Sequence, residues 1–239
     1  MMFRARSYSP FPCLHRLWIP ERLFGALLAT TLSLSSVWAA DTVERSNDTR
    51  PTVISFKDLD AQNLRVLDKD LRSSLLVLVA KAASGNFKET RTLPGFPKPM
   101  VSYGVFRLKE NDLTWETQTP FPSVLRISPV GIVMEADGER QELSPSEIPA
   151  TGRIAEILSA ILSGRLSVLE ELFEVRAVRE ESRVLFVTHP KPNAQLARVI
   201  KTLRASALLD GNAHVEALEL EAADGTLTRI DLTQVKVTH

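Results

Sequence analysis

The chain has almost no cysteine: of its 239 residues only Cys13 carries a thiol. One cysteine excludes a disulfide within the chain and a metal site built from several thiolates. The chain also lacks an excess of positive charge, since Lys plus Arg and Asp plus Glu both number 29. No basic stretch is interleaved with aromatic residues, so the sequence predicts that nucleic acid is not a partner.

No apolar run approaches the roughly 20 residues that a membrane-spanning helix needs. The longest, 23–34, follows four arginines and precedes Val37 and Ala39, which fit the small-residue rule of a cleavage site. We therefore expect residues 1–39 to be a secretory signal peptide, with an uncleaved anchor as the alternative. Cleavage would leave 25 basic and 28 acidic residues and no cysteine, and the mature protein would not span a membrane.

The motifs of common enzyme active sites are missing. The chain contains no G-x-S-x-G, no phosphate-binding loop, no H-E-x-x-H and no C-x-x-C. Its acidic pairs Glu170-Glu171 and Glu180-Glu181 are adjacent in sequence, and adjacent side chains do not face each other. The histidines after the leader are far apart, at His189, His214 and His239. The sequence therefore predicts no catalytic residues, no metal and no cofactor.

The segment after the leader is polar and then becomes helical in pattern. We expect residues 40–65 to be an N-terminal tether and residues 66–239 to be a single domain. Leucines recur at spacings of three and four from Leu64 to Leu78, which predicts a helix over 58–83. Ser84-Gly85 provides a stop signal.

The remainder alternates between apolar and polar residues in short segments. This period of two, with Asp137-Gly138 and Asp224-Gly225 as turn signals, is typical of antiparallel strands. The predicted strands are 87–93, 100–108, 113–119, 123–128, 131–136, 140–143, 173–178, 183–188, 203–209, 215–221 and 227–235. So many consecutive strands curl or close, and the predicted fold class is mainly β (α+β).

A helical pattern interrupts the strands between residues 151 and 172. Thr151 can cap a first helix and Gly164 can end it, and Ser167 with Glu170 forms a capping-box pattern for a second. The first helix carries a complete apolar stripe at Ile154, Ile157, Leu158, Ile161 and Leu162. Such a stripe is most simply explained by packing in a core, and the cover of an apolar pocket is the alternative.

Residues 85–132 carry motifs whose order and spacing match a known family. They are Phe87, Gly104 with Phe106, Trp115 with Pro120, and Gly131-Ile132. In these motifs the chain resembles the outer-membrane lipoprotein carrier (LolA-like) family, and in element order the resemblance extends from about Leu67 to the C-terminus. It implies a half-open antiparallel β-barrel of about 10 to 11 strands with an N-terminal helix and lid helices.

The resemblance also implies a function. Members carry acylated cargo across the periplasm, so we expect a periplasmic location, an acylated lipoprotein or lipid as cargo, an inner-membrane donor and an outer-membrane acceptor. The residues expected to form the hydrophobic cavity are Phe87, Phe106, Trp115, Leu125, Ile127 and Met134 on strands, and Ile154, Leu158, Ile161 and Leu162 on the lid.

Three positions depart from the family pattern. A glutamine of the first strand is Glu89 here, and the latch arginine that would hold the lid falls at Lys109, for which an ordinary solvated surface position is the alternative. Lysine keeps the charge but lacks the planar fork of donors. The proline-rich loop 94–99 is also unlike the best-known carriers. These departures favour a divergent member whose cargo is a glycolipid or another envelope lipid.

Two other functions stay open from the sequence. One is an envelope structural or interaction module with the same fold and a filled barrel. The other is an enzyme acting on a lipid or glycan, for which the sequence offers no motif.

Overall fold

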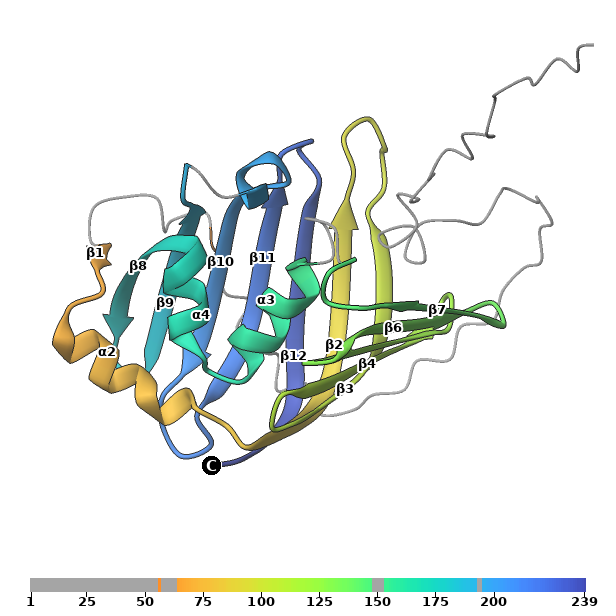
Figure 1. Ribbon diagram of the computed structural model, residues 1–239. Coiled ribbons are helices and arrows are strands. Elements are labelled where there is room, and N and C mark those ends of the chain that lie inside the picture. The colour runs from red at the N-terminus through yellow and green to blue at the C-terminus, as the bar shows by residue number, and fades with distance from the viewer. Residues whose placement is uncertain (1–55, 57–63, 148–152, 193–194) are drawn as a thin grey trace, which may run out of the picture. The chain divides into compact units, whose positions relative to one another are not determined.

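The structure, a computed structural model, describes residue 56 and residues 64–147, 153–192 and 195–239 (Figure 1). The predicted signal peptide, Cys13 and the proposed cap at Thr151 lie outside the described residues. The boundaries 1–39, 40–65 and 66–239 therefore stay predictions.

Twelve strands form one antiparallel sheet in the order β1-β8-β9-β10-β11-β12-β2-β3-β4-β5-β6-β7. The sheet ends at β1 on one side and at β7 on the other, so it curves without closing (Figure 1). This arrangement confirms the predicted half-open antiparallel barrel. The strands are β1 (Arg65–Val66), β2 (Ala82–Thr92), β3 (Met100–Lys109), β4 (Asp112–Thr119), β5 (Ser123–Ser128), β6 (Gly131–Ala136), β7 (Glu139–Leu143), β8 (Phe173–Glu180), β9 (Arg183–Pro190), β10 (Ile200–Leu208), β11 (His214–Ala222) and β12 (Leu227–Thr238).

The structure has one strand more than the eleven expected from the alternation. All eleven are present, 123–128 and 131–136 with the predicted ends and the others with one or both ends shifted. The twelfth is the two-residue β1, which pairs with β8. Two residues are too few to show a period in the sequence. The turn at Asp137-Gly138 has positive φ at both residues, as a tight hairpin turn requires.

The helix predicted over 58–83 is wrong in extent. Asp68 caps α2 (Lys69–Leu75) by accepting a hydrogen bond from the Leu71 amide at 2.9 Å, and a 3₁₀ turn, η2 (Leu76–Leu78), ends the helical stretch. Ser84-Gly85 does not stop a helix but lies within β2. Pairing of β2 with both β12 and β3 outweighs the local helical spacing there.

Two helices lie on one side of the sheet, in front of β9, β10 and β11 in Figure 1. They are α3 (Arg153–Leu162) and α4 (Leu166–Leu172), followed later by the 3₁₀ turn η3 (Gln195–Arg198). Gly164 ends α3 with a φ of +68°, as expected. The predicted capping box of the second helix is wrong, because α4 begins at Leu166 with Arg165 at its cap and no side-chain cap bond.

The sheet separates two apolar clusters. The larger lies between the concave face and the helices and includes Phe106, Phe173 and Ile157. The smaller consists of Phe56, Leu185, Val187 and Ala217 on the outer face, with Arg229 5.2 Å from the centre of the Phe56 ring. Phe56 is buried and Arg65 is in β1, so at these two positions the predicted tether segment contacts the sheet.

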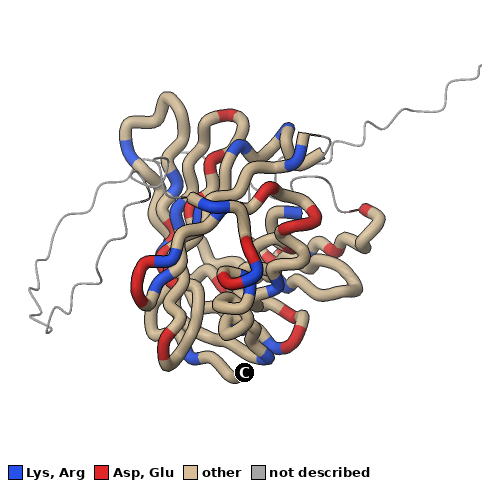
Figure 2. The backbone as a smooth tube through the Cα atoms, turned by 90° about the vertical axis from the view of Figure 1, so that its left-hand side faces the viewer, with Lys and Arg blue, Asp and Glu red and all other residues tan. Residues whose placement is uncertain are grey.

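Along the backbone, positions with basic and acidic residues are intermixed on the side of the domain that contains β1 and α2 (Figure 2). Several form ion pairs on exposed surface, such as Lys201 with Glu221 at 2.6 Å. Exposed pairs contribute little to stability. The apolar clusters on the two faces of the sheet therefore dominate the packing of the domain.

Candidate functional site

The cavity residues predicted on strands share the concave face. Phe106 pairs with Trp115 across β3 and β4, Trp115 pairs with Leu125, and Leu125 pairs with Met134. Directly paired residues point to the same side of a sheet, so these side chains form one continuous row. Ile127 belongs to the next row, where it pairs with Leu113 and Ile132.

Aromatic rings form the middle of this face. The Phe87 ring stacks on Trp115 with centroids 3.9 Å apart, and the centroid of the Phe106 ring lies 6.0 Å from that of Trp115. Gly104 makes this stacking possible, because a Cβ on Gly104 would lie 2.6 Å from the Phe87 ring and 2.0 Å from the Glu116 carbonyl oxygen. Because Gly104 has no side chain, the Phe87 ring can occupy the space above it.

The apolar stripe of α3 lies against the same cluster. Ile161 and Leu162 are buried, and Ile154 and Leu158 are partly buried against it. Ile157 is the most deeply enclosed residue of the stripe, at 2% exposure. All ten predicted cavity residues are therefore buried or partly buried, and nine of them belong to the cluster or pack on it, with Met134 beside Leu125. Their role in ligand binding stays a prediction.

The helices fill most of the space above the sheet. One cavity of about 20 Å³ lies between the helices and β9 to β11, and another of about 10 Å³ lies beside Phe106 and Leu162. The larger holds about one water molecule. The hydroxyl of Thr188 faces it, buried, with no hydrogen-bond partner among the described residues. Neither of these two cavities among the described residues has room for an acyl chain.

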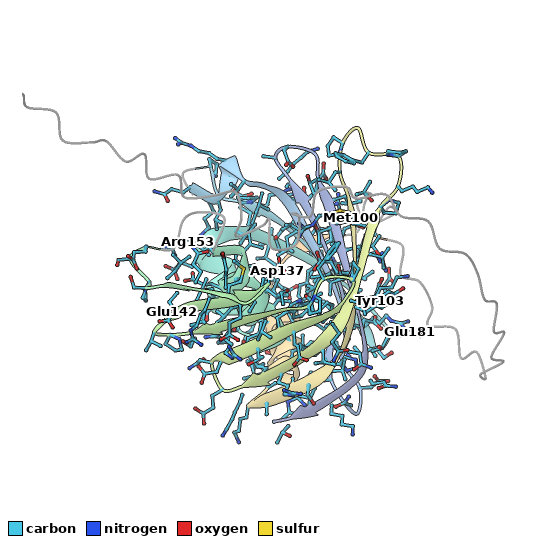
Figure 3. The ribbon with its side chains drawn as sticks, turned by 90° about the vertical axis from the view of Figure 1, so that its right-hand side faces the viewer. Met100, Tyr103, Asp137, Glu142, Arg153 and Glu181 are labelled. Carbon is cyan, nitrogen blue, oxygen red and sulfur yellow. The ribbon has the colours of Figure 1, made fainter. Side chains whose placement is uncertain are left out.

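A larger hollow of about 640 Å³ lies at the turn Asp137-Gly138 and is lined by Glu116, Glu135 and Arg140 among others. Glu116, Glu135 and Arg140 belong to one row of paired positions on the side of the sheet opposite Trp115, and Asp137, labelled in Figure 3, lies in the turn between β6 and β7. Charged lining suits solvent better than an alkyl chain. This hollow is therefore separate from the apolar face.

The end of α3 is attached to the segment after η2. The Ala80 amide donates to the Ser163 carbonyl oxygen at 3.2 Å, and a Cβ on Gly164 would lie 2.2 Å from the Leu78 carbonyl oxygen. Arg165 donates to the hydroxyl of Ser163 at 2.8 Å. Backbone contact this close leaves no room for a side chain at position 164.

An ion pair connects α4 to α2. Two nitrogens of the Arg72 guanidinium donate to the two oxygens of Glu170, at 2.8 Å and 2.6 Å. Such a two-point contact is the geometry that gives arginine–carboxylate pairs their specificity. The two residues are 98 positions apart, so no local sequence signal could have indicated the pair.

The predicted latch, Lys109, lies exposed at the end of β3, in register with Asp112. No hydrogen bond or ion pair joins it to α3 or α4 within the described part of the chain. Its role as a latch stays a prediction, while the polar contact between helices is made by Arg72 and Glu170.

A buried ion pair lies farther along β2. Glu89 and Arg91 are 5% and 4% exposed, and the Arg91 guanidinium donates to a Glu89 carboxylate oxygen at 3.1 Å. Burial raises the pKa of the Glu89 carboxyl, and Arg91 opposes that rise. The period of two places both residues on the face of Phe87. The sequence marked Glu89 as unusual but gave no reason to expect its burial.

The described residues lack two further features. No group of His, Cys, Asp and Glu side chains there is arranged to hold a metal ion. No helix in that part of the chain has both the length and the apolar character needed to cross a membrane.

Comparisons with known proteins give similarity of fold. No protein-family model matches the chain, and no curated protein sequence matches it. A DUF1329 family protein from Desulfovibrio piger is 12% identical with a TM-score of 0.41, over 70% of this chain and 90% of that one. The Mycobacterium tuberculosis lipoprotein LppX is 10% identical with a TM-score of 0.39, over 72% and 98%.

A domain from Vibrio parahaemolyticus that is named for outer-membrane lipoprotein sorting is 6% identical with a TM-score of 0.36, over 66% and 85% of the two chains. Identities this low say nothing about shared cargo. The open antiparallel sheet of this chain, with β1 and β7 at its two edges, is itself the fold that its motifs predicted.

Proposed function

We propose that the protein is a periplasmic carrier that shelters the acyl chains of a lipoprotein or an envelope lipid on its way towards the outer membrane. The observation that carries the proposal is the pairing of two apolar surfaces. The concave face presents Phe87, Phe106 and Trp115, and α3 presents Ile157 and Ile161 towards it. The alkyl chain of a ligand would find apolar contacts on both surfaces.

The energetics suit reversible loading. An acyl chain in water costs about 0.8 kcal/mol for each CH₂ group, so a carrier must cover most of the chain. The existing cavities of about 20 and 10 Å³ are too small for that. The helices would therefore move aside, and the acyl chain would take over the apolar contacts that the α3 side chains make in the empty state.

The leader supports the location. A signal peptide over 1–39 would export the chain, and the carrier would accept cargo from an inner-membrane donor and release it to an outer-membrane acceptor. Binding and release need no catalytic group, which fits the absence of enzyme motifs in the sequence.

The first experiment is to purify the protein from the periplasm of its expression host without detergent and to record its native mass. Extraction and mass spectrometry of any bound lipid would follow. A bound acylated species supports the carrier and identifies the class of cargo. A protein that carries no lipid and takes none up from lysolipids or lipopeptides contradicts it.

A substitution on α3 tests the same proposal. Leu158→Glu places a charge on the partly buried side of the helix, where it would oppose an alkyl chain. We expect loss of lipid binding with an unchanged far-UV spectrum and a cooperative unfolding transition.

Arg153→Glu is the matched control, since it introduces the same side chain on the exposed start of the helix. It should bind lipid as the unmodified protein does. Unfolding of Leu158→Glu, with no lipid bound to either variant, would favour a packed core over a lid.

The small cavities also favour a second candidate function, an envelope interaction module with a filled barrel. Such a module would bind a protein partner and no lipid. The native mass measurement separates the two candidates, because only a carrier exchanges its helix contacts for an acyl chain.

A further inference from the structure

The concave face changes from apolar to polar along the strands. Near the β3–β4 turn it presents Ala83, Leu108 and Leu113, all buried. At the opposite end of β2 it presents Glu89 and Arg91, the two charged side chains that are buried among the described residues. The face thus has the polarity of an amphiphile: a long apolar part and one charged end.

Strand pairing confirms which face the charged pair occupies. Phe87 is in register with Leu232, and Glu89 with Ile230, on β12. Leu232 is buried in the concave cluster and Ile230 packs on it. Since paired residues point to the same side of a sheet, Glu89 lies on the concave face together with Phe87. Arg91, two residues farther, pairs with Thr228 and Met100.

Distance along the strand fits a long acyl group. Six residues separate Ala83 from Glu89, which corresponds to about 20 Å of extended strand. A chain laid from the Ala83 end across the Phe87–Trp115 stack would bring its head group to Arg91. Figure 3 shows Met100, the β3 partner of Arg91, near the end of its strand, so the charged pair lies towards the rim of the sheet.

A buried ion pair is a poor device for stability alone. Removing two charges from water costs several kcal/mol, and apolar replacements of similar size are often as stable. Burial raises the pKa of the Glu89 carboxyl, because the charged carboxylate is less stable in the buried site than in water. An anion bound to Arg91 would replace that carboxylate and allow Glu89 to take up a proton.

We infer that Arg91 binds the anionic head, a carboxylate or a phosphate, of an acylated ligand whose chain lies on the concave face. In the empty protein the Glu89 carboxylate accepts a hydrogen bond from the Arg91 guanidinium, in the place that the ligand's anion would take. The inference rests on the proposed carrier function and narrows its cargo to anionic lipids. The planar guanidinium suits both head groups, because each offers oxygens that accept two parallel hydrogen bonds.

The test compares three ligands with one palmitoyl chain: palmitate, palmitoyl lysophosphatidate and the neutral monopalmitoylglycerol. The full-length protein is used with Trp18→Phe and Trp38→Phe, so that Trp115 is the fluorescent reporter. Trp115 stacks on Phe87 on the expected path of the acyl chain. The unmodified site should bind at least one of the two anions about tenfold or more tighter than the neutral lipid. Which anion binds tighter decides between carboxylate and phosphate.

Arg91→Gln should remove the preference and leave the affinity for monopalmitoylglycerol unchanged. Lys88→Gln is the matched control, because it removes one positive charge from the exposed, opposite side of the same strand. It should retain the preference. If Arg91→Gln does not fold, the double variant Glu89→Leu/Arg91→Met replaces the pair with apolar side chains and serves the same comparison.

Equal affinity for all three ligands, or a preference that persists without Arg91, overturns the inference and leaves the carrier intact. Failure of every probe to bind overturns the carrier as well. Binding of the neutral lipid therefore distinguishes the two failures. It persists if only the inference about Arg91 is wrong, and it is absent if the carrier function is wrong as well.

Discussion

Single residues determine how closely the layers of this protein approach. Gly104 is the clearest example, because the Phe87 ring occupies the space where a side chain would be. Phe87 in turn stacks on Trp115, so the aromatic middle of the concave face depends on a residue that has no side chain.

Replacement of Gly104 by alanine tests this dependence. The new Cβ would lie 2.0 Å from the Glu116 carbonyl oxygen, which is backbone and must shift. Overpacking of this kind costs about 1 to 3 kcal/mol, so we expect a loss of about 3 kcal/mol in the free energy of unfolding in urea.

Ser102→Ala is the control for that measurement. Ser102 is two residues away on the same face of β3 and is less buried. We expect a change within about 0.5 kcal/mol. Equal stabilities of the two variants would mean that the Phe87 ring does not need the space at Gly104.

At the scale of elements, the helices α3 and α4 are held on the sheet by apolar packing and by few polar contacts. The end of α3 contacts the Leu78–Ala80 backbone through Ser163 and Gly164, and Glu170 of α4 pairs with Arg72. The end of α4 accepts a hydrogen bond from the Lys191 amide at the Leu172 carbonyl oxygen, 3.0 Å away.

Gly164→Ala should loosen the attachment. Its φ of +68° disfavours alanine by about 1 to 2 kcal/mol, and the Cβ would also lie 2.2 Å from the Leu78 carbonyl oxygen. We expect faster amide hydrogen exchange in 153–172 than in the unmodified protein, with exchange in β9 to β11 unchanged.

Gly211→Ala separates the two effects. Gly211 also has positive φ, at +54°, but a Cβ there meets nothing within 4 Å. It should reproduce the conformational penalty without faster exchange in the helices. Faster exchange throughout the Gly164→Ala variant would instead show that helices and sheet unfold as one unit.

Elements with a regular period were predictable from the sequence, and those defined by distant contacts were not. Alternation revealed the eleven longer strands, and the apolar stripe revealed α3. The end of the first helix was missed because Ala82 to Gly85 pairs with two strands whose partner residues are distant in sequence, from Gly85↔Phe106 on β3 to Ala82↔Thr238 on β12. The Arg72–Glu170 and Glu89–Arg91 pairs have the same cause: only the fold shows which charges meet or become buried.

The whole molecule has an apolar cluster on each face of its sheet. The concave cluster lies under the helices, and the outer cluster is covered by Phe56. Because the sheet separates them, changes in one should add to changes in the other. The outer cluster is then a structural element that ligand binding leaves untouched.

Phe56→Ala examines this separation. Phe56 is 3% exposed, and truncation of a buried phenylalanine costs about 3 to 5 kcal/mol. We expect a loss of about 3 kcal/mol in the free energy of unfolding, with lipid affinity and Trp115 fluorescence of the folded protein unchanged. Phe96→Ala, at a residue 66% exposed, should change stability by less than about 0.5 kcal/mol.

The pairing of β2 with β12 has a consequence for synthesis. Strands β2 to β7 form one meander and β8 to β12 another, and the sheet becomes continuous only through the β12–β2 pair. Every chain emerges from the ribosome N-terminus first, so one edge of β2 stays unpaired until β12, Leu227–Thr238, has been made. A chain that stops before Leu227 would present two open edges beside an apolar face, which is the surface that chaperones and proteases recognise.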